Sequence, residues 1–146
     1  MFQVVVSSTL IPMSDDKKKI LLVEDDAALA NVYTARLAME GFETRLVTNG
    51  EDALSAATEF RPDLVLLDAM MPKITGFDVL DILRNTPETM NVRIIMLTAL
   101  SQPKDRDRAM KLGADDYIVK SQVVIGDVIA RIKYHLGLDS KNEPSI

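Results

Sequence analysis

The sequence predicts one α/β domain in which a doubly wound parallel sheet carries helices on both faces. A chain of 146 residues with 47% hydrophobic residues fits one domain with one covered core. Apolar runs of strand length alternate five times with segments of helical period, a pattern typical of parallel strands joined by crossover helices. We expect this domain at residues 19–137, between an N-terminal extension at 1–18 and a C-terminal tail at 138–146.

The apolar runs and the helical segments predict the individual elements in chain order. The run Ile20–Val23 is continuously apolar, as a strand buried on both faces requires, and the helix after it shows an apolar stripe that ends before Gly41. Pro62 stands just before the third strand, Pro87 breaks the chain before the fourth, and Gly113 ends the fourth helix. The strands are therefore predicted near 19–24, 43–48, 63–67, 92–97 and 115–119, and the helices near 26–40, 50–60, 76–84, 104–112 and 124–136.

The first thirteen residues lack the basic start and long apolar stretch of a secretory signal. Two interpretations are open for them. Translation begins at Met13, which makes residues 1–12 an upstream artefact, or Val4–Val6 form the centre of an extra strand. No apolar run approaches the ~20 residues of a membrane span, so we expect no membrane insertion.

Charge and cysteine content restrict the class of function. The formal net charge is −5 and the pI is near 4.9, which argues against direct binding of nucleic acid, because neutralising phosphates requires a concentrated basic surface. The chain has no cysteine, which excludes disulfides and thiolate metal sites and fits a reducing, cytoplasmic location.

Polar side chains follow four of the predicted strands directly. Asp25 and Asp26 come after the first, Asp68 after the third, Thr98 ends the fourth and Lys120 follows the fifth. The carboxyl ends of parallel strands share one edge of the sheet, where doubly wound folds bind ligands. We therefore expect these five side chains to converge.

Three converging carboxylates require a cation, because each pair repels by about 4 kcal/mol at ~4 Å and an effective dielectric of ~20. With only oxygen ligands available, Mg²⁺ is the natural ion. We expect Asp26 as a direct ligand, Asp25 as a ligand through water, Asp68 beside them and the backbone carbonyl of Met70 as a further ligand. Taken alone, an acidic pair before a helix is more often an N-cap with a favourable charge on the helix dipole.

Asp68 is then the candidate nucleophile for a phosphoryl donor. A carboxylate held by Mg²⁺ and Lys120 stays ionised, and Lys120 and Thr98 can bind the phosphoryl oxygens. The expected product is an aspartyl phosphate.

These motifs resemble the receiver domain of two-component response regulators over about Lys19–Leu136. The resemblance implies strand order 2-1-3-4-5, phosphorylation of Asp68 by a histidine kinase or histidine phosphotransfer protein, Ala99 beside Thr98 in the phosphoryl-binding set, and Tyr117 as an aromatic switch. Ser121 departs from the family, which usually has a proline there, often after a cis bond. The motifs are Val23-Glu24-Asp25-Asp26, Leu66-Leu67-Asp68-Ala69-Met70-Met71-Pro72 with Gly76, Leu97-Thr98-Ala99, and Gly113-Ala114-Asp115-Asp116-Tyr117-Ile118-Val119-Lys120.

The predicted function is that of a stand-alone response regulator, a phosphoacceptor signalling protein and not an enzyme. Phosphate on Asp68 is expected to remodel the surface of the fourth helix, fifth strand and fifth helix for a downstream protein, and onward relay of the phosphoryl group is equally compatible. We expect a monomer or a phosphorylation-dependent homodimer, the latter through Asp115 and Asp116 opposite Arg131 and Lys133.

Other side chains receive less specific interpretations. Met70 and Leu100 are apolar residues that would flank the water path to the phosphate, and so predict slow dephosphorylation. Met70 and Met71 are otherwise expected as loop and core filler. His135 is expected as a surface residue or as a favourable charge on the C-terminal dipole of the last helix, and 104–108 as a solvated helix face with local ion pairs.

Two alternatives come from other classes. A haloacid-dehalogenase-like phosphatase needs a second Asp two residues after the nucleophile, where this chain has Met70. A pseudo-receiver that binds partners without phosphate would lack some of the acidic, Thr or Lys positions, and all of them are present.

Overall fold

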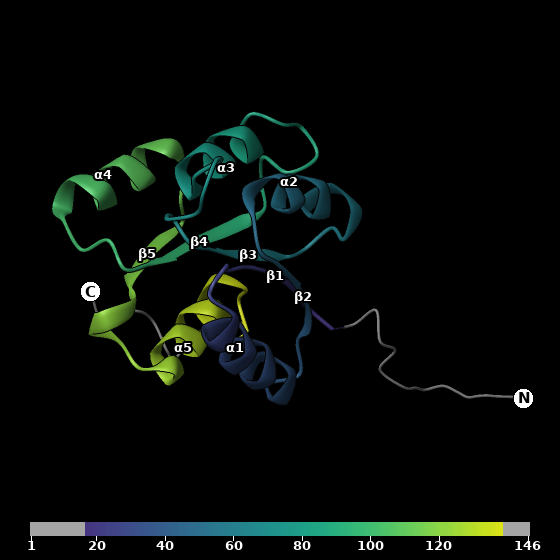
Figure 1. Ribbon diagram of the computed structural model, residues 1–146. Coiled ribbons are helices and arrows are strands. Elements are labelled where there is room, and N and C mark those ends of the chain that lie inside the picture. Colours follow the sequence, from purple (N-terminus) through teal and green to yellow (C-terminus); the bar gives the residue numbers. More distant parts are fainter. Residues whose placement is uncertain (1–16, 139–146) are drawn as a thin grey trace, which may run out of the picture.

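A computed structural model describes residues 17–138, which form one five-stranded parallel sheet between two layers of helices (Figure 1). The strand order β2-β1-β3-β4-β5 confirms the order that the resemblance implies. The expectations for residues 1–16 lie outside the described residues. The strands are β1 Lys19–Val23, β2 Glu43–Val47, β3 Leu64–Leu67, β4 Arg93–Thr98 and β5 Asp116–Val119, and the helices are α1 Ala27–Met39, α2 Gly50–Glu59, α3 Gly76–Arg84, α4 Pro103–Leu112 and α5 Ile125–His135, with a short 3₁₀ turn at Lys120–Gln122.

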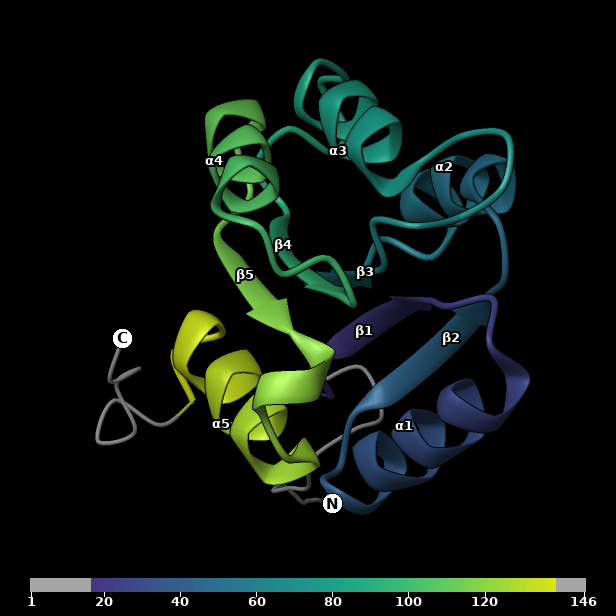
Figure 2. The ribbon, with the colours of Figure 1, turned by 60° about the vertical axis from the view of Figure 1, so that its left-hand side comes forward.

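The helices divide unequally between the two faces of the sheet. α1 and α5 cover one face, while α2, α3 and α4 cover the other (Figures 1 and 2). Successive strand residues point to opposite faces, so in β1 Leu21 packs with α2 and α3 while Ile20 packs with α1 and α5. The central strands are buried on both faces, which explains their continuous apolar sequences.

The helix ends agree with their capping residues. Asp26 is the N-cap of α1 and accepts a hydrogen bond from the backbone N–H of Leu29 at 3.1 Å, and Thr75 forms a capping box with Asp78 at the start of α3. Gly113 adopts a left-handed conformation, with φ of 106°, and ends α4 as predicted.

The segment after β5, where the family usually has a proline, forms a short turn. Residues Lys120–Gln122 form a single 3₁₀ turn, and no cis peptide bond occurs between residues 17 and 138. Ser121 is therefore accommodated by a turn of trans peptides.

No helix within the described range is long and apolar enough to cross a membrane.

The two acids of the predicted two-fold contact, Asp115 and Asp116, are both engaged within the chain. Asp116 is buried and binds Arg131 and His135, with 2.8 Å between its Oδ2 and the Nε2 of His135. Asp115 accepts a hydrogen bond from Arg84 at 2.9 Å. His135 lies in the last turn of α5, as one of the two expectations for it stated, but its side chain binds Asp116 and does not lie free at the surface.

Candidate functional site

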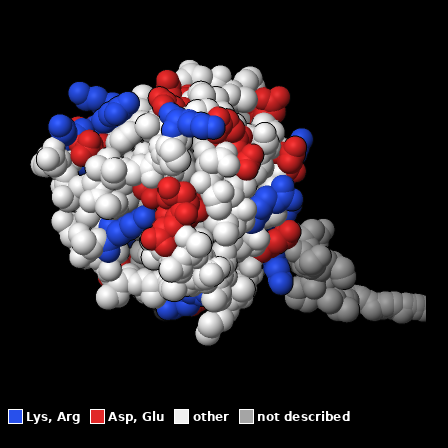
Figure 3. Space-filling view, viewed as in Figure 1, with Lys and Arg blue, Asp and Glu red and all other residues white. Residues whose placement is uncertain are grey.

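Three carboxylates meet at the carboxyl ends of β1 and β3. The side chains of Glu24, Asp25 and Asp68 each place an oxygen within 4.8 Å of the others. Their meeting follows from the sheet, because Val23 of β1 is in register with Leu67 of β3 and the acids come directly after these residues. Acidic side chains also form a patch at the centre of the face in Figure 3.

Asp26 lies outside this cluster, contrary to its predicted part as a direct ligand. Its side chain caps α1, and its backbone N–H donates to Glu24 Oε2 at 3.1 Å. Glu24, which sequence reasoning assigned no role, takes its place among the acids and is only 3% exposed. Because β1 ends at Val23, Glu24 and Asp25 are the first two residues that can face the edge of the sheet.

Lys120 bridges two of the three acids. Its Nζ donates to Glu24 Oε1 at 2.8 Å and to Asp68 Oδ2 at 3.1 Å. Burial alone would lower the pKa of Lys120, but the hydrogen bond to Glu24 and the charge of Asp68 outweigh it and raise that pKa. Burial raises the pKa of Glu24, and its bond to Lys120 offsets this only in part. The ammonium therefore compensates part of the negative charge at the edge.

Backbone N–H groups position Asp68 and the loop that follows it. Asp68 is 6% exposed, and its Oδ1 accepts from the backbone N–H of Met70 at 3.1 Å. The first residue of α3, Gly76, donates its N–H to Ala69 at 3.0 Å. A Cβ at position 76 would lie only 2.1 Å from the carbonyl oxygen of Asp68, so the close approach of α3 to this loop requires glycine.

Thr98 and Tyr117 both hold the loop between β4 and α4 at Leu100. Thr98 is fully buried, and its Oγ1 accepts from the N–H of Leu100 at 3.3 Å. The hydroxyl of Tyr117 donates to the carbonyl of Leu100 at 2.9 Å, and burial raises the pKa of Tyr117 to about 12. Ala99 lies exposed between Thr98 and Leu100. The end of β4 and the aromatic ring on β5 thus act on one loop.

Met70 lies in the loop after β3 and Met71 in the core, in agreement with the expected loop and core positions. Met70 is 53% exposed, whereas Met71 is 6% exposed. Met70 and Leu100 line a cavity of about 480 Å³ that is mostly apolar, together with Met71, Pro72 and Phe77, and the charged residues Asp105 and Arg108 also line it. Of the predicted residues, the structure therefore brings Asp25, Asp68 and Lys120 together, and Met70 and Leu100 both line one cavity.

The chain shares extensive sequence with curated relatives. It is 42% identical over 124 residues to the DNA-binding response regulator MtrA of Mycobacterium bovis, covering 85% of this chain and 53% of that protein. It is 44% identical over 108 residues to the probable transcriptional regulator ycf27 of Pyropia yezoensis, covering 74% and 43% respectively. The chain thus spans about half the length of the curated relatives it matches.

Solved structures share the fold. A putative response regulator from Chloroflexus aurantiacus matches with a TM-score of 0.78 and 29% identity, over 83% of this chain and 98% of that one. The receiver domain of the sensor histidine kinase PA1611 from Pseudomonas aeruginosa, which has a magnesium ion coordinated in its active-site cleft, matches with a TM-score of 0.76, 29% identity and the same coverage. The family model of the response regulator receiver domain matches residues 20–133, and the chain belongs to this family.

Proposed function

We propose that this receiver domain accepts a phosphoryl group on Asp68 with the help of Mg²⁺. The observation that carries the proposal is the cluster of Glu24, Asp25 and Asp68 bridged by Lys120. A set of carboxylate oxygens without sulfur or imidazole suits Mg²⁺, which keeps several waters and takes few protein ligands. Asp25 and Asp68, with the backbone carbonyl of Met70, would hold the ion, and Glu24 would bind through water or through Lys120.

The protein side chains provide positioning and charge. A carboxylate oxygen of Asp68 forms a bond to phosphorus while the bond from phosphorus to the donor nitrogen of a phosphohistidine breaks. Lys120 is already bound to Asp68 and can donate to a phosphoryl oxygen, as can the hydroxyl of Thr98, next to the Ala99 backbone. When bound, Mg²⁺ offsets the charge on the same oxygens.

The output would be a change in a protein-binding surface. If Thr98 turns its hydroxyl to a phosphoryl oxygen, the N–H of Leu100 loses its present acceptor, and the carbonyl of Leu100 is the partner of Tyr117. Phosphorylation would thereby move the β4–α4 loop and the adjoining surface of α4, β5 and α5. Donors would be a histidine kinase or phosphotransfer protein in the cytoplasm, and residues 19–137 would be the functional unit.

A matched pair of variants tests the ligand set. Asp25→Asn should weaken Mg²⁺ binding at least about tenfold, because a charged ligand is lost. Asp26→Asn should leave binding near the parent value, since asparagine is as good an N-cap as aspartate. Isothermal titration with Mg²⁺ measures both, and equal losses in the two variants would contradict the assignment.

Intact mass after incubation with Mg²⁺ and acetyl phosphate tests the acceptor. The parent should gain one phosphoryl group and Asp68→Asn none, because an amide is a poor nucleophile. An adduct of unchanged yield in Asp68→Asn would contradict the assignment of Asp68.

A metabolite phosphatase is less favoured, because Met70 stands where its acid/base carboxylate is needed.

A further inference from the structure

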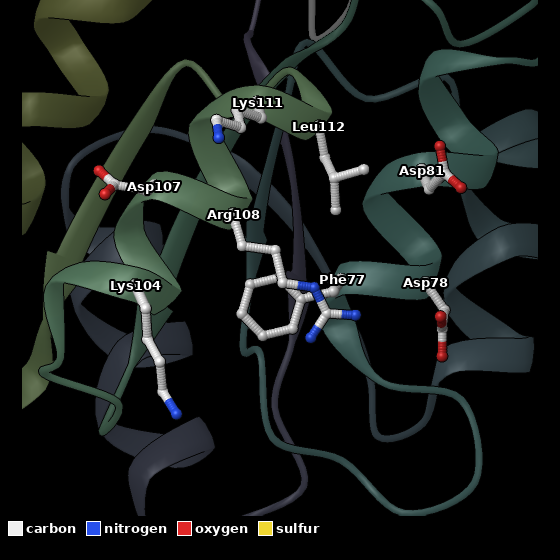
Figure 4. Close-up of a pocket in the computed structure, with 8 residues that line it drawn as sticks. All are labelled: Phe77, Asp78, Asp81, Lys104, Asp107, Arg108, Lys111 and Leu112. Carbon is white, nitrogen blue, oxygen red and sulfur yellow. The ribbon is translucent and has the colours of Figure 1, made fainter.

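A groove of about 520 Å³ runs between α3 and α4, on the face of the sheet that carries these helices. Phe77 and Leu112 are among its lining residues, and the guanidinium of Arg108 lies 4.2 Å from the centroid of the Phe77 ring. Figure 4 shows the groove with its lining side chains. None of the proposed metal ligands or phosphoryl-binding residues lines it.

The two walls of the groove carry opposite charge. α3 contributes the exposed acids Asp78 and Asp81, one helical turn apart, and α4 contributes the exposed cations Lys104, Arg108 and Lys111 on one stripe. Asp107 also lines the groove from α4, so that wall holds three cations and one acid. Figure 3 shows basic side chains gathered over α4, at the upper left.

These opposite charges do not neutralise each other within the chain. The ion pairs found between residues 17 and 138 include none of the charged residues of the groove. Asp78 accepts hydrogen bonds from Thr75 and Asp81 accepts one from Asn85, but neither of these donors is charged. A partner with the complementary arrangement would provide the ion pairs that the walls do not form themselves.

We propose that this groove binds the same groove of a second copy of the chain. A two-fold axis along the groove places α3 of each copy over α4 of the other, so acids meet cations on both sides. In Figure 4 Asp78 and Lys104 lie toward one end of the groove, and Asp81 and Lys111 toward the other. A rotation about this axis keeps those ends aligned, and pairs Asp78 with the second copy's Lys104 and Asp81 with the second copy's Lys111.

The contact is weak and sensitive to salt, because its pairs are exposed and little apolar surface lies between them. It requires no phosphoryl group on Asp68, because the charged residues of both walls already line the groove in the unphosphorylated chain. Its test in the unphosphorylated chain is therefore independent of the proposed phosphotransfer, and it uses none of the residues of the predicted contact through Asp115 and Asp116.

Sedimentation velocity on the full chain, over concentrations up to the millimolar range, tests the proposal at low and high salt. The parent should dimerise at low salt and dissociate at high salt. Asp78→Lys with Asp81→Lys, and separately Lys104→Asp with Lys111→Asp, should each raise the dissociation constant roughly tenfold or more. An equimolar mixture of the two variants should restore dimers, because every pair in the mixed dimer is attractive again.

Two further controls keep the test decisive. Asp78 also belongs to the capping box of α3, so the pair Asp81→Lys and Lys111→Asp repeats the reversal and rescue with the cap intact. Glu51→Lys with Glu59→Lys makes the same change of charge on the exposed face of α2 and should leave dimers intact. A monomeric parent, failure of the mixture to restore dimers, or equal loss in the α2 control would overturn the proposal.

Discussion

Replacement of Gly76 by alanine should separate steric fit at the acceptor loop from ordinary helix stability. The added Cβ would lie 2.1 Å from the carbonyl oxygen of Asp68 and 2.7 Å from the Cα of Ala69. Both contacts are with backbone atoms, so no side chain can rotate away. The first turn of α3 and the loop after β3 must therefore move apart by about 1 Å.

Gly126 provides a matched control, because it also lies in the first turn of a helix. A Cβ there meets nothing closer than the guanidinium of Arg36, at 4.0 Å. Gly126→Ala should raise the free energy of unfolding by about 0.5–1 kcal/mol, the usual gain for alanine over glycine in a helix. Gly76→Ala has the same gain but suffers an overpacking cost of about 1–3 kcal/mol.

The expected result is a difference of about 1–3 kcal/mol between the two variants, measured by urea unfolding followed by circular dichroism. Because the carbonyl and carboxylate of Asp68 belong to one residue, Gly76→Ala should also slow phosphorylation by acetyl phosphate, by up to about 100-fold for a shift of 1 Å. If Gly76→Ala is as stable as Gly126→Ala and is phosphorylated at the parent rate, the argument from close approach is wrong.

Three more outcomes follow from contacts of single side chains. Tyr117→Phe removes the hydrogen bond to Leu100, so we expect the unfolding free energy to fall by about 1 kcal/mol. Amide hydrogen exchange in the β4–α4 loop should also become faster, and unchanged exchange would contradict this. Burial would raise the pKa of Asp116, but hydrogen bonds from Arg131 and the chain's only histidine lower it overall. The unfolded state then binds this proton more readily, so the unfolding free energy should fall as pH decreases from about 5 through the lowered pKa. Asp116→Asn should remove this pH dependence and lower the unfolding free energy by about 3–5 kcal/mol at neutral pH. Urea unfolding at a series of pH values measures both, and an unchanged pH dependence in the variant would mean that another acid is responsible. Met70→Asn with Leu100→Glu should accelerate decay of the phosphorylated form several-fold, about 1 kcal/mol in the barrier, whereas an unchanged decay rate after removal of the donor would exclude these residues as barriers to water.

The fold was predictable because its signals are local. Central strands buried on both faces show unbroken apolar sequences, and the helix after β1 ends at Met39, just before the left-handed Gly41, as its pattern predicts. The edge strand β2 carries a weaker pattern, since most of its residues are exposed or half-buried. Its position follows from the alternation of elements more than from its own sequence.

The site was predictable only to within one residue. Three consecutive acids follow β1, and spacing alone does not tell which of them face the edge and which one caps the helix. That choice depends on where the strand ends and on the N–H of Leu29, which needs an acceptor and finds Asp26. The buried bonds of Asp116 to Arg131 and His135 were likewise missed, because they depend on how α5 packs against β5.

The bridge from Lys120 to the acids also has a consequence for folding. Lys120 lies 96 positions from Glu24 and 52 from Asp68, and β5 is an edge strand that joins the sheet only through β4. A nascent chain without β5 has the two carboxylates but no ammonium between them, so their repulsion is uncompensated. The proposed acceptance of a phosphoryl group on Asp68 would therefore become possible only when the last strand docks, and a partly folded chain would not be phosphorylated.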